Sequence, residues 1–147
     1  MKYKPYQKRD AVKNYFPLPN EIFSLDLASG EIAVYSYLLY REDRKTFQCW
    51  PSYKTIGRAV VLSQNTVRKY VAGLEERGLI KTEPTKIRTR DGRSRNGNLL
   101  YTVRPIRKAV DEYNERQMRK ADEDAERWKA AKALEQNDLR GTEDEAG

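Results

Sequence analysis

The chain has 147 residues, of which 38% are hydrophobic and 35% are charged, and its formal net charge is +7. It contains no His and a single Cys, so it lacks the commonest general base and the commonest neutral metal ligand, and it cannot form an internal disulfide. These features argue against a metal site, a bound cofactor and an enzyme. Because no apolar run has the length of a signal peptide or a membrane span, we expect a cytoplasmic protein without a membrane partner.

The charge is unevenly distributed along the chain. Residues 1–104 hold 20 Lys and Arg against 10 Asp and Glu, whereas residues 105–147 hold 9 against 12. A length of 147 residues is sufficient for one domain with extensions. The basic surplus falls on the part that we expect to form the domain, and a basic domain favours nucleic acid as its partner.

The first twenty residues are basic and are interrupted by Pro5, Pro17 and Pro19. This pattern predicts a flexible arm at 1–20 and no regular element. Such an arm either follows a DNA groove or is a solvated terminus whose last residues close onto the domain.

Residues 25–40 carry apolar side chains at helical spacing, which predicts the first helix of the domain. Either Asp26 or Ser29 is the expected N-cap. A polar run follows, after which residues 46–50 have the length of a short strand. Cys49 lies in this strand, where we expect an ordinary half-buried thiol and no nucleophile.

Two short helices joined by a tight turn are predicted between Ser52 and Gly78. Ser52 follows a proline and is the expected cap of a first helix of about two turns. Ser63 is the expected cap of a second helix, which has an apolar stripe along one face. The stripe consists of Val67, Tyr70, Val71 and Leu74. Gly78 is expected to end this helix in the C′ position.

The other face of the second helix carries long amide and cationic side chains, which suit base edges and phosphates. We expect Gln64, Asn65 and Arg68 to read bases and Lys69 to hold a phosphate. The full set of expected DNA-binding residues on the helix pair is Tyr53, Lys54, Ser63, Gln64, Asn65, Thr66, Arg68 and Lys69. The alternative is a small helical protein-interaction domain with the same stripe.

The segments WPSYKTIGRAV and LSQNTVRKYVAGLEERGLI resemble the helix-turn-helix of winged-helix proteins, above all that of bacterial regulators and of replication initiators from plasmids, phages and integrated elements. The resemblance covers about 25–104 and implies that the helix after Ser63 is the recognition helix. It also implies a small residue at Gly57 and a strand at 46–50 that pairs with the wing hairpin. The family commonly has Gly where this chain has Val61, and a β-branched residue is poorly tolerated at positive φ. Either the turn avoids that conformation or the two helices cross at a different angle.

Beyond Gly78, residues 79–90 and 99–104 are predicted to form two strands around a loop that contains the turn signals Asp91-Gly92 and Asn96-Gly97. The basic residues of this hairpin are Lys86, Arg88, Arg90, Arg93 and Arg95. Alternation places the first three on one face of a strand, and the other two lie in the loop. An Arg-rich and Gly-rich hairpin tip suits a DNA-contacting wing, and the alternative is a solvated loop.

Residues 105–137 are rich in Ala, Glu, Lys, Arg and Asp, which predicts one long charged helix of about 45 to 50 Å. A thin stripe runs along it from Ile106 to Trp128, but it includes Gln117 and several alanines and falls short of a heptad repeat. We therefore expect at most a weak homodimer, which forms in solution or only on DNA. Residues 138–147 are expected to be a disordered acidic tail.

Together these features predict a mainly α protein with a small β-hairpin, in which a winged helix-turn-helix at 21–104 precedes a long C-terminal helix. The expected function is sequence-specific binding of double-stranded DNA. The resemblance leaves two roles open, namely a transcriptional regulator and a replication initiator of a mobile element. The alternative function is a winged-helix module that assembles a replication or transfer complex through protein contacts.

Overall fold

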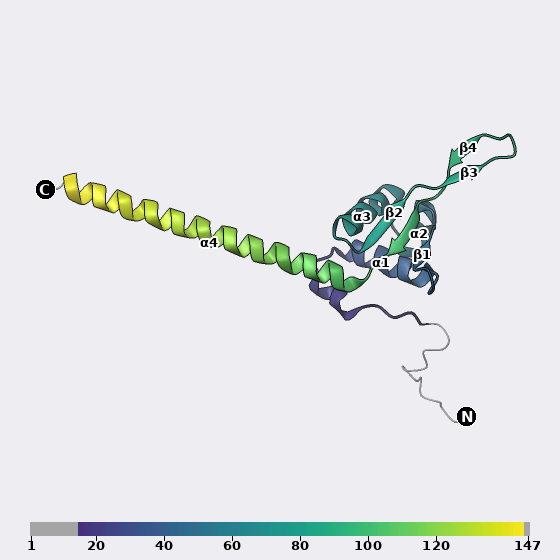
Figure 1. The fold of residues 1–147 in the computed structure, drawn as a ribbon, viewed down its shortest axis with the longest axis horizontal. Coiled ribbons are helices and arrows are strands. Elements are labelled where there is room, and N and C mark those ends of the chain that lie inside the picture. Colours follow the sequence, from purple (N-terminus) through teal and green to yellow (C-terminus); the bar gives the residue numbers. More distant parts are fainter. Residues whose placement is uncertain (1–14, 146–147) are drawn as a thin grey trace, which may run out of the picture. The chain divides into compact units, whose positions relative to one another are not determined.

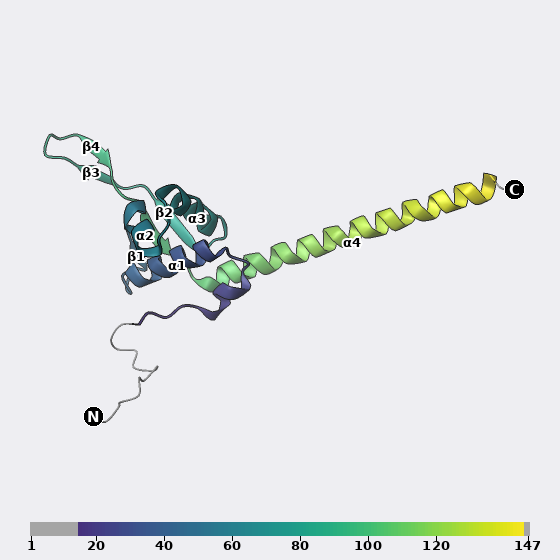
Figure 2. The same ribbon diagram turned by 180° about the vertical axis from the view of Figure 1, so that it is seen from behind.

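The computed structural model describes residues 15–145 and divides the chain into two compact units, Met1–Val110 and Asp111–Gly147. Figure 1 and Figure 2 show their helices and strands from opposite sides. The predicted fold class, mainly α with a small β-hairpin and a long C-terminal helix, is confirmed, and a three-stranded antiparallel sheet accompanies the hairpin. Most of the expected basic arm lies at 1–14, outside the described residues, and so do the last two residues of the expected acidic tail.

The first unit begins with a short 3-10 helix, η1 (Asn20–Ser24), and then α1 (Ser29–Arg41). The prediction that Asp26 or Ser29 caps α1 is wrong, because Ala28 is the N-cap and its backbone N–H donates to Oε1 of Glu31 at 3.1 Å. Asp26 has a φ of 55°, whereas an N-cap is typically extended. Glu31 also pairs with Arg77, which lies at the C-terminal end of another helix, at 3.6 Å between Oε2 and Nε. The cap of α1 thus depends on a tertiary contact.

Two further helices, α2 (Tyr53–Val60) and α3 (Gln64–Glu76), pack with α1 around one core. The predicted stripe of α3 lies in this core, with three residues buried and Tyr70 half-buried. The largest fully buried side chains are Tyr35, Tyr101, Ile22, Leu38, Ile56, Leu74, Leu79, Ile80, Val34 and Val67. Burying one aliphatic side chain of this size stabilises the fold by about 1.5 to 3 kcal/mol, so the stripe fixes which face of α3 remains for solvent.

The strands form two small antiparallel sheets. The first has the order β1 (Gln48–Cys49), β5 (Leu100–Val103) and β2 (Ile80–Glu83), and the pairing of β1 with β5 confirms what the resemblance implied. The second is a hairpin of β3 (Lys86–Arg88) and β4 (Ser94–Asn96), which extends away from the first sheet in Figure 1. The predicted strand 79–90 is therefore two strands, since the intervening segment contains Pro84, which lacks the N–H that a continuous ladder requires.

The C-terminal helix α4 (Ile106–Glu145) has 40 residues, which corresponds to about 60 Å. Its predicted end near residue 137 is wrong, because the helix continues through Gly141 to Glu145. The cost of about 1 kcal/mol for a glycine inside a helix does not terminate it there. Within the first unit, Ala109 is buried and Ile106 is half-buried. From Asn114 to Gly141 every residue is exposed, which leaves the predicted stripe uncovered there.

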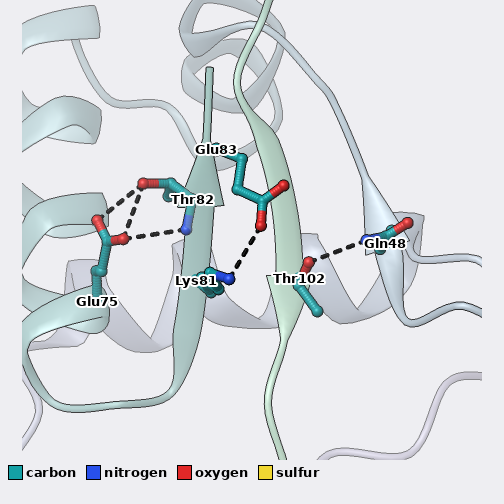
Figure 3. A network of polar contacts seen from close by, with 6 residues as sticks. All are labelled: Gln48, Glu75, Lys81, Thr82, Glu83 and Thr102. Atoms are coloured by element: carbon teal, nitrogen blue, oxygen red, sulfur yellow. Dashed lines mark hydrogen bonds and ion pairs between the residues drawn. The ribbon is translucent and has the colours of Figure 1, made fainter. Parts of the chain in front are cut away.

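A polar network connects α3 to the first sheet, as Figure 3 shows. The backbone N–H of Thr82 in β2 donates to Oε1 of Glu75 at 3.1 Å, and the Thr82 hydroxyl donates to both carboxylate oxygens of Glu75. On the neighbouring strands, the Gln48 amide donates to the Thr102 hydroxyl at 3.2 Å. Because Glu75 accepts the N–H of an edge strand, it both fixes α3 against β2 and blocks pairing of that edge at Thr82.

Candidate nucleic-acid interface

Both helices of the α2–α3 pair begin with the predicted serine caps. The Oγ of Ser52 accepts the Thr55 N–H at 3.0 Å, and the Oγ of Ser63 accepts the Thr66 N–H at 3.2 Å. Ser63 and Thr66 also share a hydrogen bond between their hydroxyls, at 2.8 Å. Since these two hydroxyls already hold the start of α3, their part in the expected DNA-binding set is first of all to fix the helix N-terminus.

The end of α3 is fixed as firmly as its start. Gly78 has a φ of 77°, and its N–H donates to the Glu75 carbonyl at 3.0 Å. The N–H of Leu79 donates to the Leu74 carbonyl at 3.1 Å, and both leucine side chains are buried. These are the two hydrogen bonds of a Schellman motif, so the predicted role of Gly78 is confirmed.

In the turn between α2 and α3, the backbone of Leu62 lies close to that of Gly57 in α2. The N–H of Leu62 donates to the Gly57 carbonyl at 2.9 Å, and a Cβ on Gly57 would lie 2.5 Å from the Leu62 carbonyl oxygen. Val61 has φ 58° and ψ 51° and is 87% exposed. The turn thus does not avoid the left-handed conformation, which was one of the two alternatives that the sequence left open. This conformation costs about 1 to 2 kcal/mol for a residue with a Cβ.

The solvent face of α3 presents the side chains that we expected to read DNA. Gln64, Asn65, Arg68 and Lys69 are all exposed, while the opposite face is in the core. The guanidinium carbon of Arg68 lies 5.5 Å from the centroid of the Tyr53 ring, within cation–π range. The structure therefore brings Arg68 of α3 together with Tyr53 of α2, which no local pattern in the sequence indicates.

A groove beside the N-terminus of α3 contains a basic residue that the sequence reasoning missed. The groove has a volume of about 500 Å³ and is lined by Lys54, Arg58 and Gln64, among others. Arg58 is exposed and follows Lys54 by four residues, so both cations lie on one face of α2. The four-residue spacing of Lys54 and Arg58 in the sequence could have identified this pair of cations. Cations next to a helix N-terminus form a suitable site for a phosphate.

The hairpin β3–β4 differs from the prediction in its turn. The chain reverses at Thr89–Arg93, where the Thr89 N–H donates to the Arg93 carbonyl at 2.9 Å and Gly92 has a φ of 75°. The expected second turn at Asn96-Gly97 is wrong, because Asn96 is in β4 and the Gly97 N–H donates to the Thr85 carbonyl at 2.8 Å. Local turn propensity was overridden there by the strand ladder.

The basic residues of the hairpin therefore do not share the arrangement that we expected. Lys86 pairs with Asn96, Arg88 with Ser94, and Ile87 with Arg95. Alternation places Lys86 and Arg88 on one face and Arg95 on the other, while Arg90 belongs to the turn instead of the strand. All five cations, including Arg93, are exposed. The hairpin thus presents positive charge on both faces and at its tip.

The ionisable groups in the core have structural roles. Burial raises the pKa of the Cys49 thiol to about 11, so this thiol is protonated at neutral pH and is buried more completely than predicted. Glu31 is 7% exposed and pairs with Arg77, whose Nη1 donates to the Leu25 carbonyl at 2.7 Å.

Within residues 15–145 no group of three or more His, Cys, Asp or Glu side chains is placed to hold a metal ion. No helix in that range is both long enough and apolar enough to span a bilayer.

Residues 25–80 match a family model described as a helix-turn-helix domain. This stretch contains α1, α2 and α3 and ends at the start of β2, so the hairpin β3–β4 and α4 lie outside it. The match supports the helix-turn-helix that was predicted from the sequence. It does not separate regulators from replication initiators.

Among solved structures, the chain is similar to one titled "Possible transcriptional regulator from Methanosarcina mazei Go1". The two share 16% sequence identity, the TM-score is 0.49, and the alignment covers 72% of this chain and 82% of the other. A comparison with curated protein sequences found no match.

Proposed function

We propose that the protein binds double-stranded DNA in a sequence-specific manner and has no catalytic activity. The observation that carries this proposal is the solvent face of α3, where amide and cationic side chains are exposed on a helix that the core, two caps and the Glu75–Thr82 contact hold in place. Side chains on a helix fixed in this way suit the major groove, which discriminates all four base pairs. The matched helix-turn-helix domain includes the whole of α3.

In this proposal the interface residues have three different roles. Gln64, Asn65 and Arg68 contact base edges, because amides and guanidinium groups form bidentate pairs with adenine and guanine. Lys54 and Arg58 contact phosphates beside the N-terminus of α3, and Lys69 contacts a phosphate further along the helix. These contacts supply affinity but little sequence information. The hairpin cations supply further charge, as a wing on the DNA backbone.

The biological role that we propose is control of transcription or initiation of replication on a mobile element. Both roles require only that the protein occupies a defined duplex. The location of the occupied sites separates them, since a regulator occupies promoters and an initiator occupies repeats at an origin. A protein-interaction module remains the competing function, supported by the exposed surface of α4 from residue 114 to residue 141.

The test is selection of bound fragments from random duplex DNA, followed by affinity measurements on the selected site. We expect Asn65→Ala to weaken binding and to reduce discrimination between the selected site and a scrambled duplex. We expect Lys69→Ala to weaken both duplexes equally and to reduce the slope of log affinity against log salt by about one. If selection enriches no sequence and the basic residues do not affect binding to any duplex, the interaction module is the better explanation.

We also propose that α4 supports weak dimerisation of the DNA-bound protein. Trp128 is 65% exposed, with the Lys132 ammonium 4.7 Å from its ring centroid, and Ala121 and Ala125 lie near it on the same helix. This stripe offers little apolar area, so we expect a monomer at low micromolar concentration and dimeric occupancy on the selected site. Two-fold symmetry would favour inverted half-sites about one helical turn apart.

Sedimentation of the intact chain and of a version that ends at Asn114, each with and without duplex, tests this second proposal. The shorter chain keeps the buried Ala109 and the half-buried residues of α4. Trp128→Ala in the intact chain is the matched point variant. If the truncated chain still occupies the duplex as a pair with the same cooperativity, α4 is not the dimer contact.

A further inference from the structure

Val61 combines a costly backbone conformation with a side chain that the described fold leaves largely exposed. It is one of three residues other than glycine with a positive φ among residues 15–145, and it is the β-branched one. A β-branched residue is among the least tolerant of this region, because its Cβ substituents crowd the backbone. The side chain is 87% exposed, so burial in the core does not offset the strain.

The conformation itself is required by the turn, but the valine side chain is not. The Val61 N–H donates to the Gly57 carbonyl, and the Leu62 N–H donates to the same oxygen at 2.9 Å, so the backbone path is fixed between α2 and α3. Gly or Asn would follow the same path with less strain. The side chain of the next residue, Leu62, is half-buried, whereas that of Val61 is exposed.

The surroundings of Val61 are positively charged. It lines the groove of about 500 Å³ together with Lys54, Arg58, Ser63 and Gln64, next to the N-terminus of α3. Two cations and a helix N-terminus attract a DNA phosphate. Beside each phosphate the DNA presents apolar carbon, either the deoxyribose or, at the edge of the major groove, the 5-methyl group of thymine. A branched apolar side chain at this position would be desolvated by such a contact.

We propose that Val61 contributes to DNA affinity by an apolar contact with deoxyribose carbons or a thymine methyl group, and that this contact offsets the strain of a valine in the left-handed turn. Strain of this kind is concentrated at functional sites, where the function offsets its cost. The inference rests on the proposed DNA binding and adds a residue to it. It predicts that stability and affinity change in opposite directions when Val61 is replaced.

The experiment compares Val61→Gly, Val61→Asn and Val61→Thr with the parent chain, for melting temperature and for affinity to the selected duplex. Gly and Asn relieve the strain, and Asn does so without the added flexibility of Gly, so we expect both to raise the melting temperature by about 3 °C. Both remove the two methyl groups, which we expect to weaken binding about tenfold. Thr keeps the branch and the strain but replaces one methyl group, so we expect an unchanged melting temperature and about fourfold weaker binding.

Replacing single thymines of the selected site with uracil distinguishes the two apolar partners. If the partner is a thymine methyl group, one uracil weakens binding of the parent and has no effect on Val61→Gly. If the partner is deoxyribose, uracil has the same effect on both proteins at every position, and only the protein variants weaken binding. The proposal is overturned if Val61→Gly and Val61→Asn bind as tightly as the parent, or if both lower the melting temperature. If the parent binds no duplex at all, the proposed function itself fails.

Discussion

The helix α3 and the hairpin β3–β4 both expose cations, but the rest of the protein supports them very differently. Helix α3 has a buried face, a cap at each end and a carboxylate contact to β2. Every residue of β3 and β4 is exposed, including Ile87 at 57%. Side chains on a fixed element keep the geometry that base recognition requires, whereas side chains on an exposed two-stranded hairpin supply charge. If the protein binds DNA as proposed, we expect α3 to supply specificity and the hairpin to supply affinity.

The largest effect is expected when the support of α3 is broken at Gly57. Because a Cβ at this position would lie 2.5 Å from the Leu62 carbonyl oxygen, Gly57→Ala should lower the free energy of unfolding by about 3 kcal/mol. Denaturant unfolding measures this change. The matched control is Gly92→Ala in the hairpin turn, where φ is 75° and no atom lies within 4 Å of the new Cβ. We expect a loss of about 1 to 2 kcal/mol there, which comes from the positive φ alone, and equal losses at both positions would contradict the comparison.

The next effect is loss of base discrimination when Arg68 is removed from α3. Arg68→Ala should weaken binding to the selected site by about 1 to 3 kcal/mol. It should also reduce the difference in affinity between the selected site and a scrambled duplex. Because the Arg68 guanidinium lies over the Tyr53 ring, Tyr53→Phe should retain discrimination, whereas Tyr53→Leu should lose part of it. Competition binding with both duplexes gives these values. Undiminished discrimination by Arg68→Ala would remove this residue from the set that reads bases.

A smaller effect is expected from the hairpin, where the two faces provide matched variants. Replacing Lys86 and Arg88 together with Ala removes both cations of one face, and Arg95→Ala removes the cation of the other. If the first face meets the DNA backbone, the double variant should lower the salt slope by about two and weaken binding by about 1 kcal/mol. Arg95→Ala should then change the slope by less than about one. Unchanged slopes in both cases would identify the hairpin as a solvated loop.

The smallest effect concerns Cys49 of β1, whose reactivity reports whether the sheet of β1, β5 and β2 opens locally and exposes the thiol. With a pKa raised to about 11, only about one thiol in a thousand is ionised at pH 8, and the side chain is buried. The native protein should therefore resist thiol reagents, and labelling should become fast only on unfolding. Hairpin variants should leave the labelling rate unchanged, whereas Gly57→Ala should increase it. Rapid labelling of the native parent chain would show that the sheet opens locally.

The sequence by itself determined the elements whose signals are local. Ser52, Ser63 and Gly78 lie within a few residues of the backbone groups that they satisfy, so the bounds of α2 and α3 followed from residue type and spacing. The buried stripe of α3 followed from helical periodicity, and with it the exposed set Gln64, Asn65, Arg68 and Lys69. The helical propensity of α4 was evident too, although its end was not, because no strong breaker occurs before residue 145.

Tertiary structure decided the features that depend on residues far apart in the chain. Glu31 replaced Asp26 as the capping carboxylate because Arg77, the C-cap residue of α3, holds it. The hairpin cations were divided between two faces because strand pairing set the register of β3 against β4, and alternation within a single strand could not show that partner. The left-handed turn at Val61 was imposed against the preference of the residue itself, because backbone hydrogen bonds to Gly57 fix the chain between two packed helices. Local propensities are worth about 1 kcal/mol or less per residue, and a packed core overrides them.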